Sequence, residues 1–528
     1  MSGRPSSSRN NRSSGEPVTA ASTERDSRTT GGGNGRRYGP GGRCLWLPWC
    51  QTLAFGVGHF YNDLCACMWF TYLLVFLTKA LNFSSPVAGV VILVGQITDA
   101  LATPLVGFET DQRLFPWMQR YGYRKAWHLI GTILVSVSFP FLFSECIGCA
   151  ESTPDWARLI YYIPFVMIFQ VGWASVQISH LALIPDLAST SHERTVLNGI
   201  RYAFTVLANL VVFGVCWAIL GVDTAHDKGI SPHDRHRFVI LAIAVVVSGC
   251  FVSGFFHIFV QEVTQSHQYE SLDDPVIRDS INRSESFSEP SRRWSDWFRE
   301  LRFYQMAMLY LCTRLFINVS QTYLPFYVLE TQHFAKEYIA IVPLIVYVSS
   351  FVTSTLLSMR WFKVVVTRRK AIYSCACCVG MGSCVWMWFH DLQERIFGVA
   401  VLIGIASAVL LITSLAMVAD MIGRHTRSSA FVFGAMSFCD KLSSGVAIQL
   451  IQMLQPLCTA RCELIDWFYR NVMVLVPGLS LFCGLVTILT FRPKRYLGRP
   501  MPSCNEYIDE EDACLINSSS GAINEPTS

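Results

Sequence analysis

Apolar runs of about twenty residues recur along almost the whole 528-residue sequence, and they limit the possible folds more than any other feature. A helix of this length can cross a bilayer core of roughly 30 Å. The runs must be helical, because a backbone in lipid has to satisfy its own hydrogen bonds. Only 15% of the residues are charged, whereas soluble domains contain about a quarter. The sequence therefore predicts an all-α membrane protein that spans the lipid bilayer many times.

Twelve such runs are present, and a polar stretch separates the first six from the last six. This stretch contains SLDDPVIRDSINRSESFSEPSRRWSDW and has no helical apolar period. The N-terminal residues are rich in Ser, Arg and Gly, so they cannot bury a core. We expect two pseudo-symmetric bundles of six transmembrane helices. The expected segments are a disordered tail at 1–43, the first bundle at 44–260, a linker at 261–302, the second bundle at 303–495 and a tail at 496–528.

The positions of Lys and Arg predict the orientation in the membrane. If the N-terminus is cytoplasmic, most of the 42 Lys and Arg residues fall on the cytoplasmic side, as the positive-inside rule requires. Both tails and the linker are then cytoplasmic. The net charge of +4 is too small to indicate a nucleic-acid partner.

Ionisable residues interrupt several of the apolar runs. A carboxylate in hydrocarbon costs about 2.5–3.5 kcal/mol on insertion scales, so it rarely lies there without a use. Asp99 lies in the second run, while His59 and Asp63 lie four residues apart in the first and so share a helical face. They either line a solute pathway or form a polar clamp between helices. Lys441, deep in the eleventh run, is a candidate partner for Asp63 or Asp99.

Other polar side chains lie at helical spacing in the fourth and seventh runs, and an arginine lies inside the fifth. His180 in the fourth run is either a proton carrier or a core histidine with a satisfied hydrogen bond. Arg201 in the fifth run either extends to the membrane surface or faces a cavity and binds an anionic group. The predicted substrate-binding residues are Asp63, Asp99, Gln177, Arg201, Asn318, Gln321 and Lys441.

The loop after the second run resembles the signature loop of the major facilitator superfamily, lengthened by an insertion; its matching residues include Gly122. The motifs FGVGHFYND, TDALATP, ALIPDL, IRYAF, AMVAD and DKLSSG are similar to those of the glycoside-pentoside-hexuronide cation symporters within that superfamily. The resemblance covers residues 50–495 and implies a carrier with twelve helices, in which Arg201 faces the cavity. Asp420, at the end of the tenth run, is expected to form an ion pair that stabilises one conformation. The expected gating residues are Gly107, Asp111, Arg113, Arg124, Lys125 and Asp420.

Two positions depart from the symporter pattern. Thr103 stands where the symporters carry a second acid, and Gln177 replaces the acid of their sugar site. These changes argue against a sodium site of paired carboxylates and against a sugar substrate. The motifs GHFYNDLCACMWFTYLL, TPLVGFETD, RKAWHLIGT and RYAFTVLAN resemble those of an animal subgroup of organelle transporters. This resemblance implies a carrier that brings cysteine into lysosomes and melanosomes. Such a carrier supports cystine and pheomelanin synthesis, and hence pigmentation.

Several features of the loops and tails bear on the compartment. Asn82 begins an Asn-Phe-Ser glycosylation sequon in the first luminal loop. Cys146 with Cys149, and Cys458 with Cys462, could be oxidised if their loops face a lumen. The C-terminal EYIDEEDACLI has the form of an acidic dileucine sorting signal, which clathrin adaptors would bind; its residues are Glu511, Leu515 and Ile516.

The direction of transport limits the coupling, since an acidic lumen drives proton symport outwards. Import of cysteine then requires a uniporter, an antiporter or a steep cysteine gradient. Two other functions stay open: a cation-coupled carrier of another small polar or lipid solute, and a membrane scaffold that transports nothing. No enzymatic motif, cofactor motif or metal cluster is recognisable in the sequence, so an enzyme is not expected.

Overall fold

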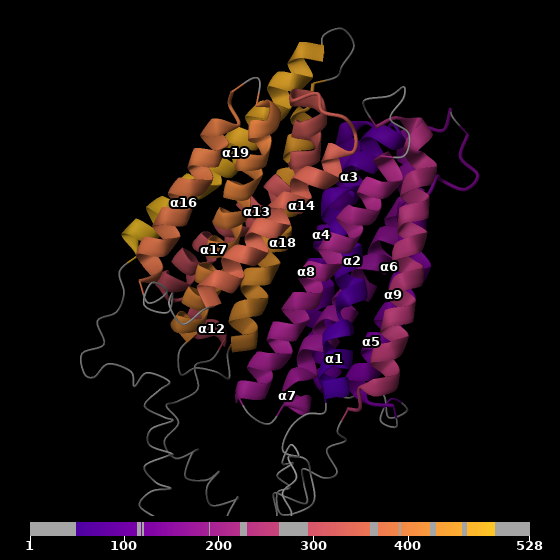
Figure 1. Cartoon of the computed structure of the whole chain (residues 1–528). Coiled ribbons are helices and arrows are strands. Elements are labelled where there is room, and N and C mark those ends of the chain that lie inside the picture. The colour runs from indigo at the N-terminus through magenta and orange to yellow at the C-terminus, as the bar shows by residue number, and fades with distance from the viewer. Residues whose placement is uncertain are drawn as a thin grey trace, which may run out of the picture. The chain divides into compact units, whose positions relative to one another are not determined.

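A computed structural model describes the membrane region of the chain. The described residues are 49–112, 118, 121–150, 152–188, 191–221, 230–262, 294–358, 368–389, 392–422, 429–456 and 462–491. The two expected tails and most of the expected linker lie outside these residues. Within them the chain forms helices and no strands (Figure 1).

The first half of the chain contains the helices of the first expected bundle. Its central packing joins α5 to α6, α4 to α6, and α2 to α8 and α9. In chain order the elements are α1 (Trp49–Val57), α2 (Phe60–Thr71), α3 (Leu73–Val75), the π-helix η1 (Phe76–Ala80), α4 (Ser85–Gln112), α5 (Tyr123–Leu142), α6 (Asp155–Ala182), α7 (Ile184–Leu187), α8 (Ser191–Gly221), η3 (Pro232–Asp234) and α9 (Arg235–Phe259).

The second half contains the remaining helices. Here α13 packs on α19, α14 on α17, and α16 on both α17 and α19. In chain order the elements are α12 (Trp294–Trp297), α13 (Leu301–Phe326), the π-helix η4 (Tyr327–Thr331), α14 (Tyr338–Ser358), α16 (Arg369–Trp386), η6 (Gln393–Arg395), α17 (Ile396–Ile422), α18 (Ser429–Leu454) and α19 (Cys462–Thr490). The short α12 falls inside the expected linker, but Trp297 is fully buried in the core of the protein.

Length and hydropathy support the membrane assignment. In the described part of the chain, nine helices are long and apolar enough to cross a membrane. A tenth span consists of α1 to η1, which bends by 46° near Tyr72. The two other expected spans are α13 and α16, which are helical but contain more charged and polar residues, such as Arg314 in α13. The predicted twelve-helix, all-α architecture is confirmed.

The two halves repeat one another closely after their first spans. Both η1 and η4 are π-helices that end such a span. Each is followed by a non-glycine residue at positive φ, Asn82 at 54° and His333 at 53°. The next residue then donates a backbone hydrogen bond to the carbonyl six residues earlier, at 2.9 Å in the first half and 3.1 Å in the second. An internal repeat is therefore present at the level of individual backbone hydrogen bonds.

The halves meet where α4 packs on α18, α8 on α14 and α2 on α13. Small residues allow the first of these approaches. A Cβ atom on Gly445 would lie 2.9 Å from the Cβ of Gln96, and one on Gly89 would lie 2.2 Å from the side-chain oxygen of Gln449. Glycine at such positions lets membrane helices pack closely. We call the end of the helices that carries Lys79 the Lys79 end, and the opposite end the Arg124 end.

Candidate functional site

A break in the first span places the first group of site residues. Gly58 and His59 interrupt the helix between α1 and α2, and a Cβ on Gly58 would lie 2.3 Å from the Phe256 ring. A broken helix leaves backbone carbonyls that need donors. Here the Phe55 carbonyl accepts from His180 Nε2 at 2.7 Å, and the Gly58 carbonyl accepts from a second buried imidazole, that of His128, at 3.0 Å. His180 is thus a satisfied core histidine at this nitrogen.

The first cluster consists of His59, Asp63, Arg201 and Thr205. Arg201 Nη2 donates to His59 Nε2 at 3.0 Å, so the imidazole proton is on Nδ1. His59 Nδ1 then donates to Asp63 Oδ2 at 2.9 Å, and the Thr205 hydroxyl donates to the same oxygen at 2.7 Å. Arg201 therefore points into the protein and reaches Asp63 through a neutral histidine. The Arg201 side chain therefore does not extend to the membrane surface, which was one of its two expected positions.

The second cluster consists of Arg314, Asn318, Asp440 and Ser444. Arg314 Nε donates to Asp440 Oδ2 at 2.8 Å. Asn318 Nδ2 lies 3.0 Å from Asp440 Oδ1 and 2.8 Å from Ser444 Oγ. Asn318 is one of the predicted substrate-binding residues, whereas Arg314 was not predicted. An arginine well inside an apolar run was the signal that could have identified it.

The two clusters are related by the internal repeat, with their charges exchanged. The interval from Asp63 to Arg314 equals the interval from Asn82 to His333. In the first half the acid is on α2 and the arginine on α8, whereas in the second half the arginine is on α13 and the acid on α18. Each of the two clusters therefore pairs an acid with an arginine from its own half.

A third group of residues joins the two halves in the middle of the helices. Lys441 Nζ lies 2.6 Å from Asp99 Oδ1 and donates to Thr103 Oγ1 at 2.7 Å. Thr103 in turn donates to Asp99 Oδ1 at 3.2 Å. The Lys441 and Asp99 side chains are only 11% and 4% exposed. Of the two partners expected for Lys441, the structure contains Asp99.

Helix α6, which reaches Lys441 through Trp173, carries polar atoms without hydrogen-bond partners in the described part of the chain. Lys441 Nζ lies 5.5 Å from the centre of the Trp173 ring. Trp173 Nε1 and Gln177 Oε1, four residues apart on α6, are buried without hydrogen-bond partners among the described residues. Buried polar groups normally have partners, so one donor and one acceptor remain for a solute or water. Gln321, also selected from the sequence, donates to Thr71 Oγ1 across the two halves at 3.3 Å.

The sequence profile of the family described as "MFS/sugar transport protein" matches residues 54–492. The chain belongs to this family. It is 43% identical over 442 residues to human major facilitator superfamily domain-containing protein 12, covering 81% of this chain and 89% of that protein. The mouse protein of the same name is 44% identical over 448 residues, with 82% and 91% coverage. The chain is also 22% identical over 473 residues to an uncharacterised symporter from Synechocystis, with 77% and 85% coverage.

Solved structures of major facilitator transporters share the fold. A D-xylose-proton symporter superposes with a TM-score of 0.58 at 15% identity and covers 85% of this chain and 98% of its own. The nucleoside transporter NupG gives a TM-score of 0.55 at 13% identity, with 84% and 100% coverage. The expected resemblance is confirmed, and the chain is a multi-pass transporter of the major facilitator superfamily.

At the Arg124 end of this major facilitator protein, the expected gating residues Arg124, Lys125 and Asp420 make contacts within their own halves. Arg124 Nη1 lies 2.5 Å from Asp186 Oδ2. Its backbone N–H and that of Lys125 each donate to the Glu262 carboxylate at 3.0 Å, which caps the start of α5. In the second half Asp420 forms an ion pair with Arg369.

Three other expected gating residues belong to α4 or to the segment that follows it. Gly107 lies in α4, where its nearest neighbouring atom belongs to Ile178. Asp111 is in the last turn of α4, and Arg113 lies outside the described residues. The sorting signal at Glu511, Leu515 and Ile516 also lies outside the described residues.

At the Lys79 end, ion pairs join the two halves. Lys79 pairs with Glu330, and these two residues occupy equivalent positions of η1 and η4. Lys336 Nζ lies 3.1 Å from Asp234 Oδ1, and both side chains are buried. Neither pair was predicted from the sequence. Among the described residues, the ion pairs between halves therefore lie at the Lys79 end and in the middle of the helices.

The sequon residue Asn82 is exposed at the Lys79 end, immediately after η1. The backbone N–H of Ser84 in the same sequon donates to Asp155 Oδ2 at 2.8 Å. Its side chain is also exposed.

Proposed function

We propose that this protein is a secondary transporter that moves cysteine into the lumen of lysosomes and melanosomes by alternating access, and so supports cystine and pheomelanin metabolism. The observation that carries the proposal is the buried Lys441–Asp99 ion pair between the two halves. A charge in the membrane interior is costly unless it has a partner or a use. Similarity to the human and mouse relatives supports a transporter, and the resemblance of the first five spans to organelle transporters suggests cysteine.

The charges of the site suit a zwitterion. Asp99 with Lys441 is neutral as a pair, and so is each of the two clusters. A solute with one ammonium and one carboxylate can enter between Asp99 and Lys441 and replace their mutual contact with two charge-assisted hydrogen bonds. A solute with net charge would leave one buried charge without a partner.

The unpaired atoms beside the ion pair provide further contacts. Trp173 Nε1 can donate to the solute carboxylate, and Gln177 Oε1 can accept from its ammonium. Trp173 lies beside Lys441, and Gln177 lies about one helical turn further along α6. The small thiol of cysteine would then contact apolar side chains of the bundle.

Alternating access requires the contacts between halves to break in turn. Opening the Lys79 end, which we assign to the lumen, would separate Lys79 from Glu330 and Lys336 from Asp234. We assign the Arg124 end to the cytoplasm. The ion pairs that the described residues form there lie within one half each, so none of them has to break when the halves separate at this end. The described conformation is therefore assigned to the side of the cycle in which cysteine enters from the cytoplasm.

The test is uptake of labelled cysteine into intact lysosomes from cells that express variants of the protein. At cysteine concentrations below KM, Asp99→Asn and Lys441→Met should each lower uptake by a factor of about 10 or more, compared at equal amounts of protein in lysosomes. Glu145→Gln is a matched control, since this acid is exposed in a loop and forms an ion pair with the half-buried Arg235. Unchanged uptake in both site variants would refute the assignment of the site, and equal uptake in cells without the protein would refute cysteine as the substrate.

A second candidate is a proton-coupled carrier of another small polar solute. It is favoured by the first cluster, where His59 and Asp63 share one hydrogen bond and could hold a transported proton. Uptake into proteoliposomes with an imposed pH gradient distinguishes the two. If the protein is proton-coupled, the wild type would use the pH gradient to accumulate its solute, and His59→Gln would no longer accumulate it. A facilitative cysteine carrier would only bring the cysteine concentrations on the two sides to equality.

A further inference from the structure

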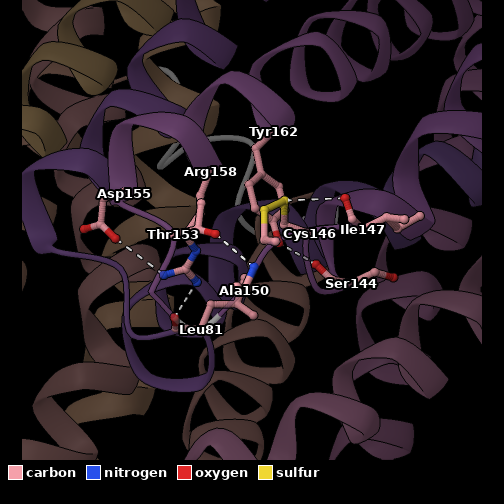
Figure 2. The surroundings of a disulfide bond; sticks show 10 residues. Leu81, Ser144, Cys146, Ile147, Ala150, Thr153, Asp155, Arg158 and Tyr162 are labelled. Carbon is pink, nitrogen blue, oxygen red and sulfur yellow. Dashed lines mark hydrogen bonds and ion pairs between the residues drawn. A yellow bond between two sulfur atoms is a disulfide. The ribbon is translucent and has the colours of Figure 1, made fainter.

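The loop between α5 and α6, at the Lys79 end, contains a disulfide between Cys146 and Cys149 (Figure 2). Their Cα atoms are 5.4 Å apart, and the bond encloses only Ile147 and Gly148. The backbone N–H of Cys149 donates to the Cys146 carbonyl at 3.2 Å, and Gly148 has φ of 81°, which a glycine adopts without strain. The turn is thus held by backbone contacts that do not depend on the disulfide.

The surrounding loop is also held by other interactions. Tyr162 Oη donates to the Ser144 carbonyl at 2.5 Å, and Glu145 pairs with Arg235 at 2.6 Å. After the disulfide, Ala150 N–H donates to Thr153 Oγ1 at 2.9 Å. A cross-link that closes four residues removes little entropy from the unfolded chain, because this effect grows with loop length. The bond therefore contributes little as a structural staple.

The pair is accessible to solvent. Ile147 is 72% exposed, both cysteines are half-buried, and a Cβ atom on Gly148 would have no neighbour within 4 Å. The free cysteines that the structure describes lie instead within helices, and several of them, such as Cys65 and Cys216, are buried. A small molecule in the aqueous phase can reach the Cys146–Cys149 bond without opening the bundle.

We propose that Cys146 and Cys149 form a thiol–disulfide exchange site for low-molecular-weight thiols at the Lys79 end. The thiolate of a small thiol attacks one sulfur; the protein S–S bond breaks, a mixed disulfide forms, and the released cysteine takes up a proton. A second small thiol attacks the mixed disulfide, releasing a small disulfide and leaving the protein pair as two thiols. Two electrons thus pass from two small thiols to the protein, and a small disulfide reverses the reaction.

The Cys-x-x-Cys spacing fits this chemistry, because the second thiol is always placed to attack a mixed disulfide on the first. The backbone hydrogen bond from the Cys149 N–H to the Cys146 carbonyl holds both cysteines in one turn. This hydrogen bond does not involve the sulfurs, so reduction of the disulfide does not remove it. The exchange site does not depend on cysteine being the transported solute. It needs only small thiols on the side of the membrane that the loop faces.

The experiment uses the full-length protein in lipid nanodiscs. It is incubated with defined ratios of reduced to oxidised glutathione, quenched with an alkylating reagent and analysed by mass spectrometry. We expect the wild-type pair to change from disulfide to two alkylated cysteines as the ratio rises, while Cys65 and Cys216 stay unmodified. Cys149→Ser should accumulate about one glutathione adduct on Cys146, and the Cys146→Ser/Cys149→Ser double variant should carry none in this loop.

A matched control is Cys375→Ser, which removes an exposed free cysteine of α16 and should leave the exchange unchanged. A wild-type pair that stays oxidised in a large excess of reduced glutathione, or that reacts only after the protein unfolds, would overturn the proposal. The wild-type measurement needs no substitution, so it decides the question even if a serine variant fails to fold. Cysteine uptake by the double variant separates this proposal from the transport function, which it should not abolish.

Discussion

Lys441→Met removes the cation of the ion pair that joins the halves. The substitution removes the contacts of Lys441 Nζ with Asp99 at 2.6 Å and with Thr103 at 2.7 Å. Asp99, whose side chain is only 4% exposed, then keeps one donor, the Thr103 hydroxyl. Breaking a buried ion pair by removing one partner costs about 3–5 kcal/mol. The melting temperature should fall by roughly 5–10 °C, at about 2 °C per kcal/mol for a chain of this size.

The same substitution should impair transport in a defined way. A charge-assisted hydrogen bond to the solute carboxylate is worth about 1.5–3 kcal/mol, so the KM for cysteine should rise roughly 10- to 150-fold. Asp99→Asn/Lys441→Met removes both charges and should recover most of the lost stability without recovering uptake. The exchanged pair Asp99→Lys/Lys441→Asp should recover stability to within about 1 kcal/mol, because the contact is restored with reversed charges.

Melting is followed by tryptophan fluorescence of purified protein, and uptake by labelled cysteine in proteoliposomes. Ser443→Ala is the matched control on the same helix, since its hydroxyl donates only to the carbonyl of Asp440. The reasoning is refuted if Lys441→Met melts with the wild type, or if the double variant is no more stable than the single ones.

Three further predictions address other contacts. Arg314→Gln should lower stability by about 3 kcal/mol, and Arg314→Gln/Asp440→Asn should recover much of it, as measured by thermal unfolding. Lys79→Glu should open the Lys79 end and increase labelling of engineered cysteines there by a membrane-impermeant reagent, and the exchanged pair Lys79→Glu/Glu330→Lys should reverse this increase. Gly58→Leu should prevent folding, because even a Cβ would lie 2.3 Å from a phenylalanine ring, and size-exclusion chromatography would then show little folded protein.

Ionisable residues in apolar runs were the most informative part of the sequence. Asp63, Asp99, Arg201 and Lys441 could all be selected because hydrocarbon penalises charge, and all four make polar contacts inside the bundle. Their partners could not be derived with certainty, since the sequence does not specify which helices are neighbours. The choice between Asp63 and Asp99 for Lys441 was resolved only by the packing of α4 on α18.

Other features left no clear signal in the sequence. Lys79 and Glu330 lie near helix ends, where charged residues are common and usually solvated, so their pairing could not be predicted. Arg314 did leave a signal, an arginine well inside an apolar run, but its acid partner on α18 could not be derived from the sequence. The break at Gly58 was also missed, because it depends on the Phe256 ring of a helix that is distant in the sequence.

The first span has two joints, one at Gly58 and His59 and one near Tyr72, where it bends by 46°. Between them lies α2, a helix of 12 residues that carries Asp63. Movement at the first break would shift α1, and movement at the second would shift η1 with Lys79. The proposed alternating access would therefore not require Asp63 to move when either end of this span moves.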